Sequence, residues 1–346
     1  MFKTEITNLR SVCLHHVGNN TTGDDLVLSS EALHLDEESR KSLYTYCFSS
    51  FKEGETFCFH NELGLEFNEA FACVSKIFAD PQTIVEQSQN LAKILYKHSE
   101  HSGIKSGDFI VVYFTDCEIN DYVTDAIGLY KCENQTSFLS VVCDPDNVGI
   151  TSLQGLDLKH VDKAALIFNT NADDGYSIAI IDNTNRTEAK YWVDYFLQVK
   201  PCADDYQHTR TFLNATKAFI TKELPAMQDV SRGEQAELMD KALRYFKENE
   251  TFEMDDFNQH VMGNEALSTD FEHYVGDYMA KNDLEPAESF TISESAVKKS
   301  QRSMKSVIKL DRNFHIYIHG GEGLIKKGYD EETGMEYYQL YFKKEE

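Results

Sequence analysis

The chain has 346 residues, with 33 basic and 58 acidic side chains and a formal net charge of -25. An apolar fraction of 41%, including 12% aromatic residues, can fill hydrophobic cores and excludes a wholly disordered chain. The length suggests two domains, since about 100–200 residues per domain is usual. The negative charge excludes a uniformly basic protein that coats nucleic acid with its whole surface.

The N-terminal region predicts short strands followed by helices. Residues 4–28 alternate loosely and break at the turn-forming run GNNTTGDD, so we expect a strand, a loop and the short strand LVLSS. Asp36 and two glutamates begin a stretch with apolar residues at helical spacing. Two further helices are expected over 68–79 and 82–101.

Beyond Gly103 the sequence becomes rich in β-forming residues. The predicted strands are 108–116, 123–132, 137–143, 162–169 and 176–182. Residues 171–175 (NADDG) are typical of a hairpin connection, whereas 187–200 places polar residues four apart among aromatics and favours a helix. We therefore expect a mostly antiparallel sheet preceded by helices.

The last part of the chain predicts helices and then strands. The expected helices are 209–223, 234–248, 254–262 and 268–281. Thr291-x-x-Glu294 has the pattern of a capping box before a short helix. The runs SVIKL, NFHIYIH and EYYQLYFKK then predict a closing antiparallel sheet, with a turn at 330–334.

These elements predict an α+β protein with two domains. Residues 1–205 would form an N-terminal α+β domain with leading helices and a mostly antiparallel sheet. Residues 206–346 would form a C-terminal domain, in which a helical segment precedes a small antiparallel sheet.

The cysteines and the apolar runs bear on the compartment. None of the eight cysteines forms a C-x-x-C pair, so we expect reduced and mostly buried thiols. No secretory signal is visible, and no run approaches the ~18 apolar residues of a membrane span. FIVVYF at 109–114, for example, has the length of a strand. We expect a cytoplasmic protein with no membrane contact.

No metal site is expected from the histidines and carboxylates. His98-Ser-Glu-His101 has too few ligands for a structural zinc and fits a helix C-terminus. His15 and His16 alternate across a predicted strand, so both cannot point into one site. Residues 144–147 lack the spaced ligands of a calcium loop and predict a turn.

Motifs for catalysis and cofactor binding are also missing. His319-Gly-Gly-Glu-Gly323 invites comparison with a lipase oxyanion loop, but the chain contains no G-x-S-x-G elbow. It contains neither a P-loop nor a G-x-G-x-x-G run, and Trp192 is expected in a core or a domain seam. We predict no catalytic residues and no cofactor, and keep an enzyme with an unrecognised site as an alternative.

Charge is distributed unevenly along the C-terminal domain. Residues 248–290 hold twelve acids and one base, for a net -11, whereas residues 294–327 hold eight bases and three acids, for a net +5. A solvated face is the simpler interpretation of such a basic segment. The sharper hypothesis is a phosphate-binding patch, whose binding would depend steeply on salt.

The candidate nucleic-acid-binding residues are the eight bases of this segment, which we call the basic patch: Lys298, Lys299, Arg302, Lys305, Lys309, Arg312, Lys326 and Lys327. The first, third and fourth of them recur at i, i+4 and i+7, so one helix face would carry all three if the helix extends that far. Only two are arginines, the residue that reads guanine bidentately, so any DNA binding should have little sequence specificity.

Four segments resemble the 37-kDa bacterial nucleoid-associated protein family. They are LVLSSEALHLDEESRKSLYTYCFSSF at 26–51, HSEHSGIKSGDFIVVYFTDCEIND with DAIGLYKCENQTSFL within 98–139, AKYWVDYFLQVKPCADDYQHTRTF at 189–212, and VIKLDRNFHIYIHGGEGLIKKGYDEETGMEYYQLYFKK at 307–344. They follow the family's order over nearly the whole chain, and none is a catalytic signature.

The resemblance implies a non-enzymatic cytoplasmic protein of the nucleoid, associated with double-stranded DNA and, in some relatives, with a type II topoisomerase. One hypothesis is direct DNA contact through the basic patch. The alternative is that the acidic segment docks a DNA-bound partner such as the topoisomerase, without direct DNA contact. The sequence does not predict the oligomeric state.

Overall fold

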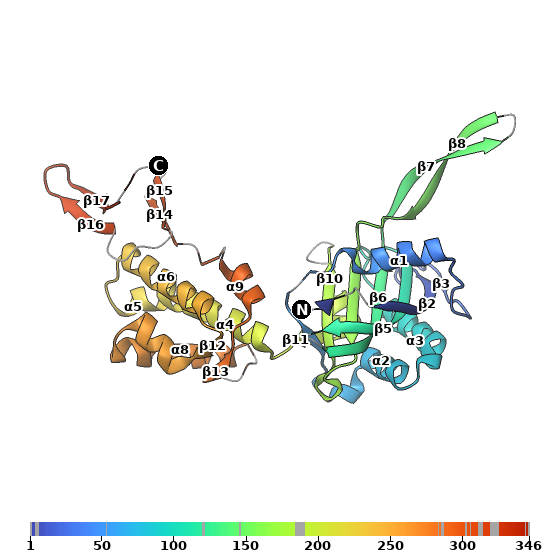
Figure 1. Cartoon of the computed structure of the whole chain (residues 1–346), viewed down its shortest axis with the longest axis horizontal. Helices are drawn as coiled ribbons and strands as arrows, with labels where there is room; N and C mark the ends of the chain where they lie inside the picture. Colours follow the sequence, from blue (N-terminus) through green and yellow to red (C-terminus); the bar gives the residue numbers. More distant parts are fainter. Residues whose placement is uncertain are drawn as a thin grey trace. The chain divides into compact units, whose positions relative to one another are not determined.

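The computed structural model divides into two compact units, Met1–Cys202 and Ala203–Glu346 (Figure 1). The structure describes residues 2–3, 7–52, 54–119, 122–144, 147–183, 191–282, 284, 287–301, 303–304, 306–310, 314–318, 325–342 and 344.

The first unit combines helices with many strands. Its strands are β1 (Phe2–Lys3), β2 (Asn8–Val17), β3 (Leu26–Val27), β4 (Phe57–Phe59), β5 (Gly107–Ile119), β6 (Tyr122–Cys132), β7 (Gln135–Asp144), β8 (Asn147–Leu156), β9 (Lys163–Phe168), β10 (Ser177–Asp182) and β11 (Val199–Pro201). Its helices are α1 (Glu37–Ser49), α2 (Glu69–Ala79), α3 (Ile84–Lys97), the 3-10 turns η1 (Leu65–Phe67), η2 (Pro81–Thr83) and η3 (Ala172–Asp174), and the π-helix η4 (Tyr191–Leu197).

Nine strands among the described residues form one antiparallel sheet. Its order is β11-β4-β10-β9-β6-β5-β2-β3, and β1 pairs with the end of β5. The β9–β10 connection runs through η3, where Asn171 and Gly175 adopt left-handed backbone angles. This is the hairpin connection predicted from NADDG.

The sheet is covered on both faces. Side chains such as Val111 and Leu129 pack against α2, α3 and η4 on one face. Their neighbours in sequence, Val112 and Tyr130, pack with α1 on the other. Double-sided burial explains the uninterrupted apolar run FIVVYF, because successive residues of a strand point to opposite faces. Figure 1 shows α1 on the opposite side of the sheet from α2 and α3.

Two predictions for this unit need correction. The strand expected at 137–143 is β7, but among the described residues it pairs only with β8, which was not predicted, and these two strands form a separate two-stranded sheet. The helix expected over 187–200 is π-helical from Tyr191 to Leu197, and the chain then enters strand β11. Residues 184–190 lie outside the described part of the chain.

The second unit is mainly helical. Its helices are α4 (Asp205–Ala218), the π-helix η5 (Phe219–Glu223), α5 (Leu224–Met227), α6 (Arg232–Glu248), α7 (Met254–Phe257), the π-helix η6 (Asn258–Met262), α8 (Glu265–Ala280) and α9 (Glu294–Gln301). Its strands are β12 (Thr251–Glu253), β13 (Ser289–Thr291), β14 (Ser306–Leu310), β15 (Phe314–Ile318), β16 (Ile325–Asp330) and β17 (Met335–Leu340). The predicted α+β class is confirmed.

An aromatic cluster forms the core of the second unit. Phe212 of α4 lies at its centre, and its ring centroid is 4.1 Å from that of Phe252 and 5.3 Å from that of Phe257. Aromatic pairs at such separations add to the free energy of burial. The cluster therefore joins α4 to β12 and α7.

Two features of the C-terminal segment differ in detail from the prediction. Thr291 ends β13, and the backbone N–H of Ala296 donates to the Ser293 hydroxyl at 3.4 Å, so the predicted capping box at 291–294 is wrong. A capping box does occur between Ser231 and Glu234 at the start of α6. The closing strands form two hairpins, β14–β15 and β16–β17, each a two-stranded sheet of its own.

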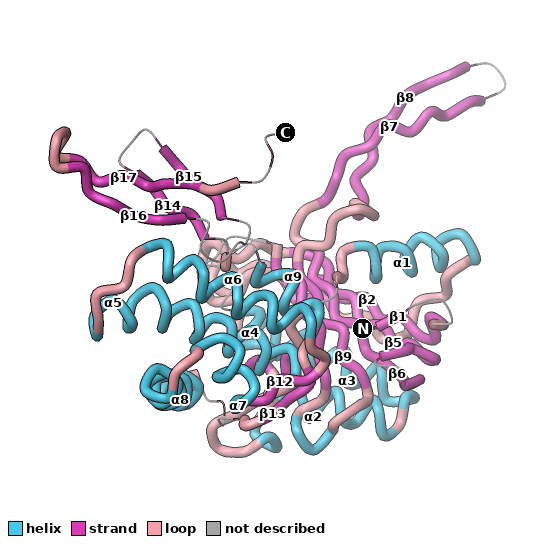
Figure 2. Tube along the Cα trace, turned by 60° about the vertical axis from the view of Figure 1, so that its left-hand side comes forward, coloured by secondary structure: helices cyan, strands magenta, loops and turns pink. Residues whose placement is uncertain are grey.

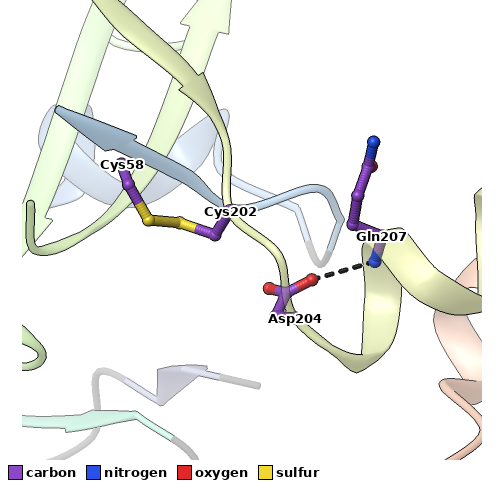
Figure 3. The surroundings of a disulfide bond; sticks show 4 residues. All are labelled: Cys58, Cys202, Asp204 and Gln207. Carbon is purple, nitrogen blue, oxygen red and sulfur yellow. Dashed lines mark hydrogen bonds between the residues drawn. A yellow bond between two sulfur atoms is a disulfide. The ribbon is translucent and has the colours of Figure 1, made fainter. Parts of the chain in front are cut away.

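A disulfide overturns the prediction of reduced thiols for two of the eight cysteines, whereas the other six are free and mostly buried, as predicted. Strand β11 pairs with β4, which brings Cys58 and Cys202 within 5.3 Å of each other at Cα, and their sulfurs are bonded (Figure 3). The signal was missed because 144 residues separate the two cysteines. Among the described free cysteines, only Cys143 is exposed.

His15 and His16 behave as their alternation predicts. His15 is buried; its Nδ1 accepts from the backbone N–H of Ser29, and its Nε2 lies 2.9 Å from the Ser88 hydroxyl. Burial lowers the pKa of His15 to about 4. His16 points to the opposite face and contacts Asp108 at 3.0 Å. The sheet thus buries one imidazole and places its neighbour beside a carboxylate on the opposite face.

Replacing both Cys58 and Cys202 with serine should lower the free energy of unfolding of the first unit by about 2–4 kcal/mol, because the bond closes a long loop. Urea denaturation without reductant measures the loss, and reduction of the unmodified protein should reproduce it. Cys143→Ser is the control and should have no effect. Equal stability of the double variant and the unmodified protein would contradict a stabilising bond.

The buried His15 predicts a loss of stability in acid. Its pKa is about 4 in the folded state and 6.5 ordinarily, so between these values the unfolded chain binds a proton that the folded chain does not. Burial of this histidine should therefore lower the free energy of unfolding by about 2–3 kcal/mol as the pH falls from 7 to 4.5. In denaturant titrations over the same pH range, the free energy of unfolding of His15→Gln should fall by correspondingly less than that of the unmodified protein. Equal falls in the two proteins would contradict the role given to His15.

Candidate nucleic-acid interface

The described residues of the basic patch lie on three elements of the second unit, α9, β14 and β16. Lys298 and Lys299 occupy the last turn of α9, where cations are favoured by the helix dipole. Lys326 and Lys327 are consecutive residues of β16. Consecutive residues of a strand point to opposite faces, so the hairpin directs one lysine to each face.

Each lysine of the α9 pair has a neighbour within the unit. The Lys298 ammonium lies 3.2 Å from the Glu294 carboxylate, one turn earlier, and both side chains are exposed. The Lys299 ammonium lies 5.6 Å from the ring centroid of Tyr206, which belongs to α4. An exposed i,i+4 pair contributes at most a few tenths of a kcal/mol, so Lys298 can exchange its carboxylate for another anion at small cost.

The hairpin pair shows the same two kinds of neighbour. Lys327 donates to Glu336 of β17 at 2.6 Å, and this hydrogen bond raises the pKa of the lysine. The Lys326 ammonium lies 5.6 Å from the ring centroid of Tyr341. The four lysines of α9 and β16 are exposed, and their neighbours are surface groups.

The structure describes only part of the predicted patch. Lys309 lies in β14, in register with His315 of β15. Arg302, Lys305 and Arg312 lie outside the described residues, and α9 ends at Gln301. The expected helix face that carries three cations is therefore not tested by the described part of the molecule.

The acidic segment 248–290 lies on α7, η6 and α8. Its acids are largely exposed, including Asp255, Glu265, Asp270, Glu272 and Asp277. Among its few ion pairs is the contact between His273 and Asp277, at 3.7 Å. Such a surface repels polyphosphate and attracts a basic protein.

A buried charged cluster in the first unit was not predicted. Lys131 of β6 and Lys163 of β9 are fully buried and lie opposite each other in the ladder, and the ring centroid of Tyr191 lies 5.8 and 5.1 Å from their ammonium groups. Burial lowers the pKa of Lys131 to about 8 and raises that of Glu133, which accepts from the Tyr191 hydroxyl. The sequence signal was a lysine within each of two apolar strands.

Both ammonium groups of this cluster have oxygen partners within the unit. Lys131 donates to the Lys105 carbonyl at 3.0 Å, and Lys163 lies 2.9 Å from the Asp182 carboxylate. Buried charges require such partners, since an isolated one would cost several kcal/mol. The arrangement ties β6, β9 and β10 to η4 and accounts for its residues without a ligand.

The described residues were predicted to hold no metal site. No group of three or more histidine, cysteine, aspartate or glutamate side chains is placed to hold a metal ion in that part of the chain. His98 follows the last residue of α3, as predicted for a helix C-terminus, and burial lowers its pKa. The residues 319–323 that resembled an oxyanion loop, and Asp146 of the predicted turn, lie outside the described residues.

Helix length and hydropathy also bear on the class of protein. None of the helices in the described ranges is long and apolar enough to cross a bilayer. The fold and the charge layout define a two-unit α+β protein that is strongly acidic overall and has a local excess of basic residues in one C-terminal segment.

Comparison with known families identifies the relationship. Residues 13–334 match the NA37 family, described as nucleoid-associated protein YejK, and the chain therefore belongs to this family of nucleoid-associated proteins. The match covers nearly the whole chain and confirms the resemblance found in the sequence. No curated protein matches the chain at a significant level.

Proposed function

We propose that this protein is a non-enzymatic, cytoplasmic component of the bacterial nucleoid that binds double-stranded DNA directly through the basic patch. The observation that carries the proposal is the local charge: residues 294–327 sum to +5 in a chain of -25. Membership of a nucleoid-associated family supports the same reading. Neither observation calls for a cofactor.

The chemistry of the patch favours phosphate contact over base reading. Six of its eight cations are lysines, which act as point charges toward phosphate, whereas guanine is best read by the fork of an arginine. The described lysines are held by exposed carboxylates or tyrosine rings, which a phosphate can displace at little cost. Binding of this kind depends on salt and hardly on sequence.

The acidic segment 248–290 supports a second candidate function. Its exposed acids on α7 and α8 present a surface that a basic protein would fit. In that case the chain reaches the nucleoid by docking a DNA-bound partner, such as a type II topoisomerase, and makes no DNA contact of its own.

Direct binding predicts a strong effect of charge reversal in the patch. The triple change Lys298→Glu, Arg302→Glu and Lys305→Glu should abolish retention on duplex DNA, because repulsion replaces three phosphate contacts. Titration of each protein onto labelled duplex DNA at about 50 and 200 mM salt measures the affinity. The unmodified protein should bind at the lower salt and lose most of its affinity at the higher salt.

The matched control reverses three exposed lysines of the first unit, Lys76, Lys93 and Lys97, and so changes the net charge equally. It should bind more tightly than the patch variant. An equal loss of DNA affinity in both variants would mean that net charge alone governs binding. Unchanged affinity of the patch variant would contradict the assignment of DNA binding to the basic patch.

Docking through the acidic segment predicts a different outcome. Capture of a topoisomerase should survive nuclease treatment and should fail when Asp270, Glu272 and Asp277 are changed to their amides, because the basic partner loses its counter-charges. Loss of capture on nuclease treatment would contradict the docking function and leave DNA as the bridge.

A further inference from the structure

Strands β7 and β8 form a hairpin that projects from the first unit and that we call the arm (Figure 2). Its ladder runs from Gln135 opposite Leu156 to Asp144 opposite Asn147. The two strands pair only with each other among the described residues, so each has an outer edge without a strand partner. A two-stranded hairpin alone is only marginally stable in water.

The arm contrasts with the edges of the large sheet. There, the edge strand β3 has two residues, and the opposite edge strand β11 has three, including Lys200 and Pro201. Short length, lysine and proline are the usual protections against edge-to-edge pairing. Strands β7 and β8 have ten residues each, and Asp144 at the tip is their one charged residue.

The arm exposes apolar side chains on both faces. Residues paired across the ladder share a face, so Val141 and Ile150, which are 61% and 69% exposed, lie together on one face. Leu139 and Val148 extend that face. Phe138 lies on the other face, with Leu153 opposite it. Exposed apolar surface of this extent on an unprotected edge is characteristic of an interface.

The charge of the chain selects the kind of partner. A basic partner would require acidic side chains along the arm, and a nucleic acid would require basic side chains. Residues 135–143 and 147–156 contain no charged side chain of either sign. A second copy carries the same -25 and is repelled over most of its surface, so it can approach only through an uncharged surface. The arm is such a surface.

We propose that the arm is a self-association site, in which β7 pairs antiparallel with β7 of a second copy about a two-fold axis at Ser140. In this register Phe138 faces Val142 of the second copy, and Leu139 faces Val141 of the second copy, so apolar residues meet apolar residues. Strand β8 is the poorer edge because it contains Gly149 and Gly155. The proposal concerns a different surface from the basic patch and is independent of it.

Backbone hydrogen bonding agrees with this axis. The pair that closes a two-residue connection is hydrogen-bonded, and residues alternate along an antiparallel ladder. Asp144 faces Asn147 in the ladder, so the even-numbered residues of β7 direct their backbone N–H and C=O groups toward β8. The odd-numbered residues, including Leu139 and Val141, direct theirs toward the outer edge. The two Ser140 residues then oppose each other in a non-hydrogen-bonded pair, with Cα atoms about 4.5 Å apart.

The size of the arm is compatible with a dimer of moderate strength. Ten residues of strand span about 33 Å, so one face of the joined ladder adds several hundred Å² per copy, approaching the ~800 Å² of a standard interface. The ladder also satisfies backbone groups at the outer edge of β7. The pairing thus covers surface that the monomer leaves exposed.

Disulfide trapping tests the register. In a Cys143→Ser background, Ser140→Cys places two thiols at a Cα separation suited to a disulfide, so mild oxidation should convert the full-length protein to a covalent dimer. Thr151→Cys in the same background is the control, because Thr151 lies on β8, opposite Ser140. Its two copies would be roughly three strand spacings, or about 14 Å, apart and should stay unlinked.

Light scattering at increasing protein concentration tests the association itself. The unmodified protein should be dimeric, and Val141→Lys should weaken dimerisation at least tenfold, because it sets two ammonium groups within the apolar contact. Thr151→Lys makes the same charge change on the strand away from the contact and should weaken it less. Thermal unfolding of each variant checks that it remains folded.

Salt separates this association from DNA binding. Rising salt screens the repulsion between two chains of net charge -25 and should therefore strengthen dimerisation. DNA binding through phosphate contacts should instead weaken as salt rises. A monomer at all concentrations and salts, or an unlinked Ser140→Cys protein, would overturn the proposal. Cross-linking of Thr151→Cys instead would assign the contact to β8 and overturn the β7 register.

Discussion

Burial of the central strands on both faces is the constraint on which the first unit depends. Residues 109–114 of β5 are all buried, and their neighbours in β6 and β9 are buried as well. A sheet of this kind is stable only if helices cover both faces. Helix α1 covers one face, and α2, α3 and η4 cover the other.

The same constraint explains the buried charges of the first unit. Lys131 and Lys163 lie in strands whose other side chains must stay in the core, so their ammonium groups are held where water is excluded. Tyr191, Glu133 and Asp182 compensate that loss of hydration. A group of titratable residues with perturbed pKa values can therefore be structural, and here its internal partners account for it.

Local patterns predicted much of this molecule, because they depend on neighbouring residues alone. The central strands, the helices and the α+β class followed from periodicity and turn residues. The three-residue strand β4 carries no such signal and exists because β10 and β11 flank it. The Cys58–Cys202 bond was missed for the same reason.

In the arm and the basic patch, too, some features follow from the local sequence and others depend on residues far away in the chain. Strand β8 contains two glycines and several polar residues, and it is a strand because β7 pairs with it. The cations of the patch could be read directly from the sequence. The carboxylates and tyrosine rings beside them could not, since Tyr206 lies 93 positions before Lys299 and Glu336 lies on a separate strand.

The position of β4 in the sheet has a consequence for synthesis on the ribosome. Its two neighbours, β10 and β11, are made more than a hundred residues later, so β4 emerges long before either is available. At about 5–20 residues per second the delay is roughly 6–24 s, during which the apolar residues of β4 have no sheet to join. The first unit can close only after Pro201 has left the exit tunnel. Its folding is therefore completed by its last strand, as the helices of the second unit begin to appear.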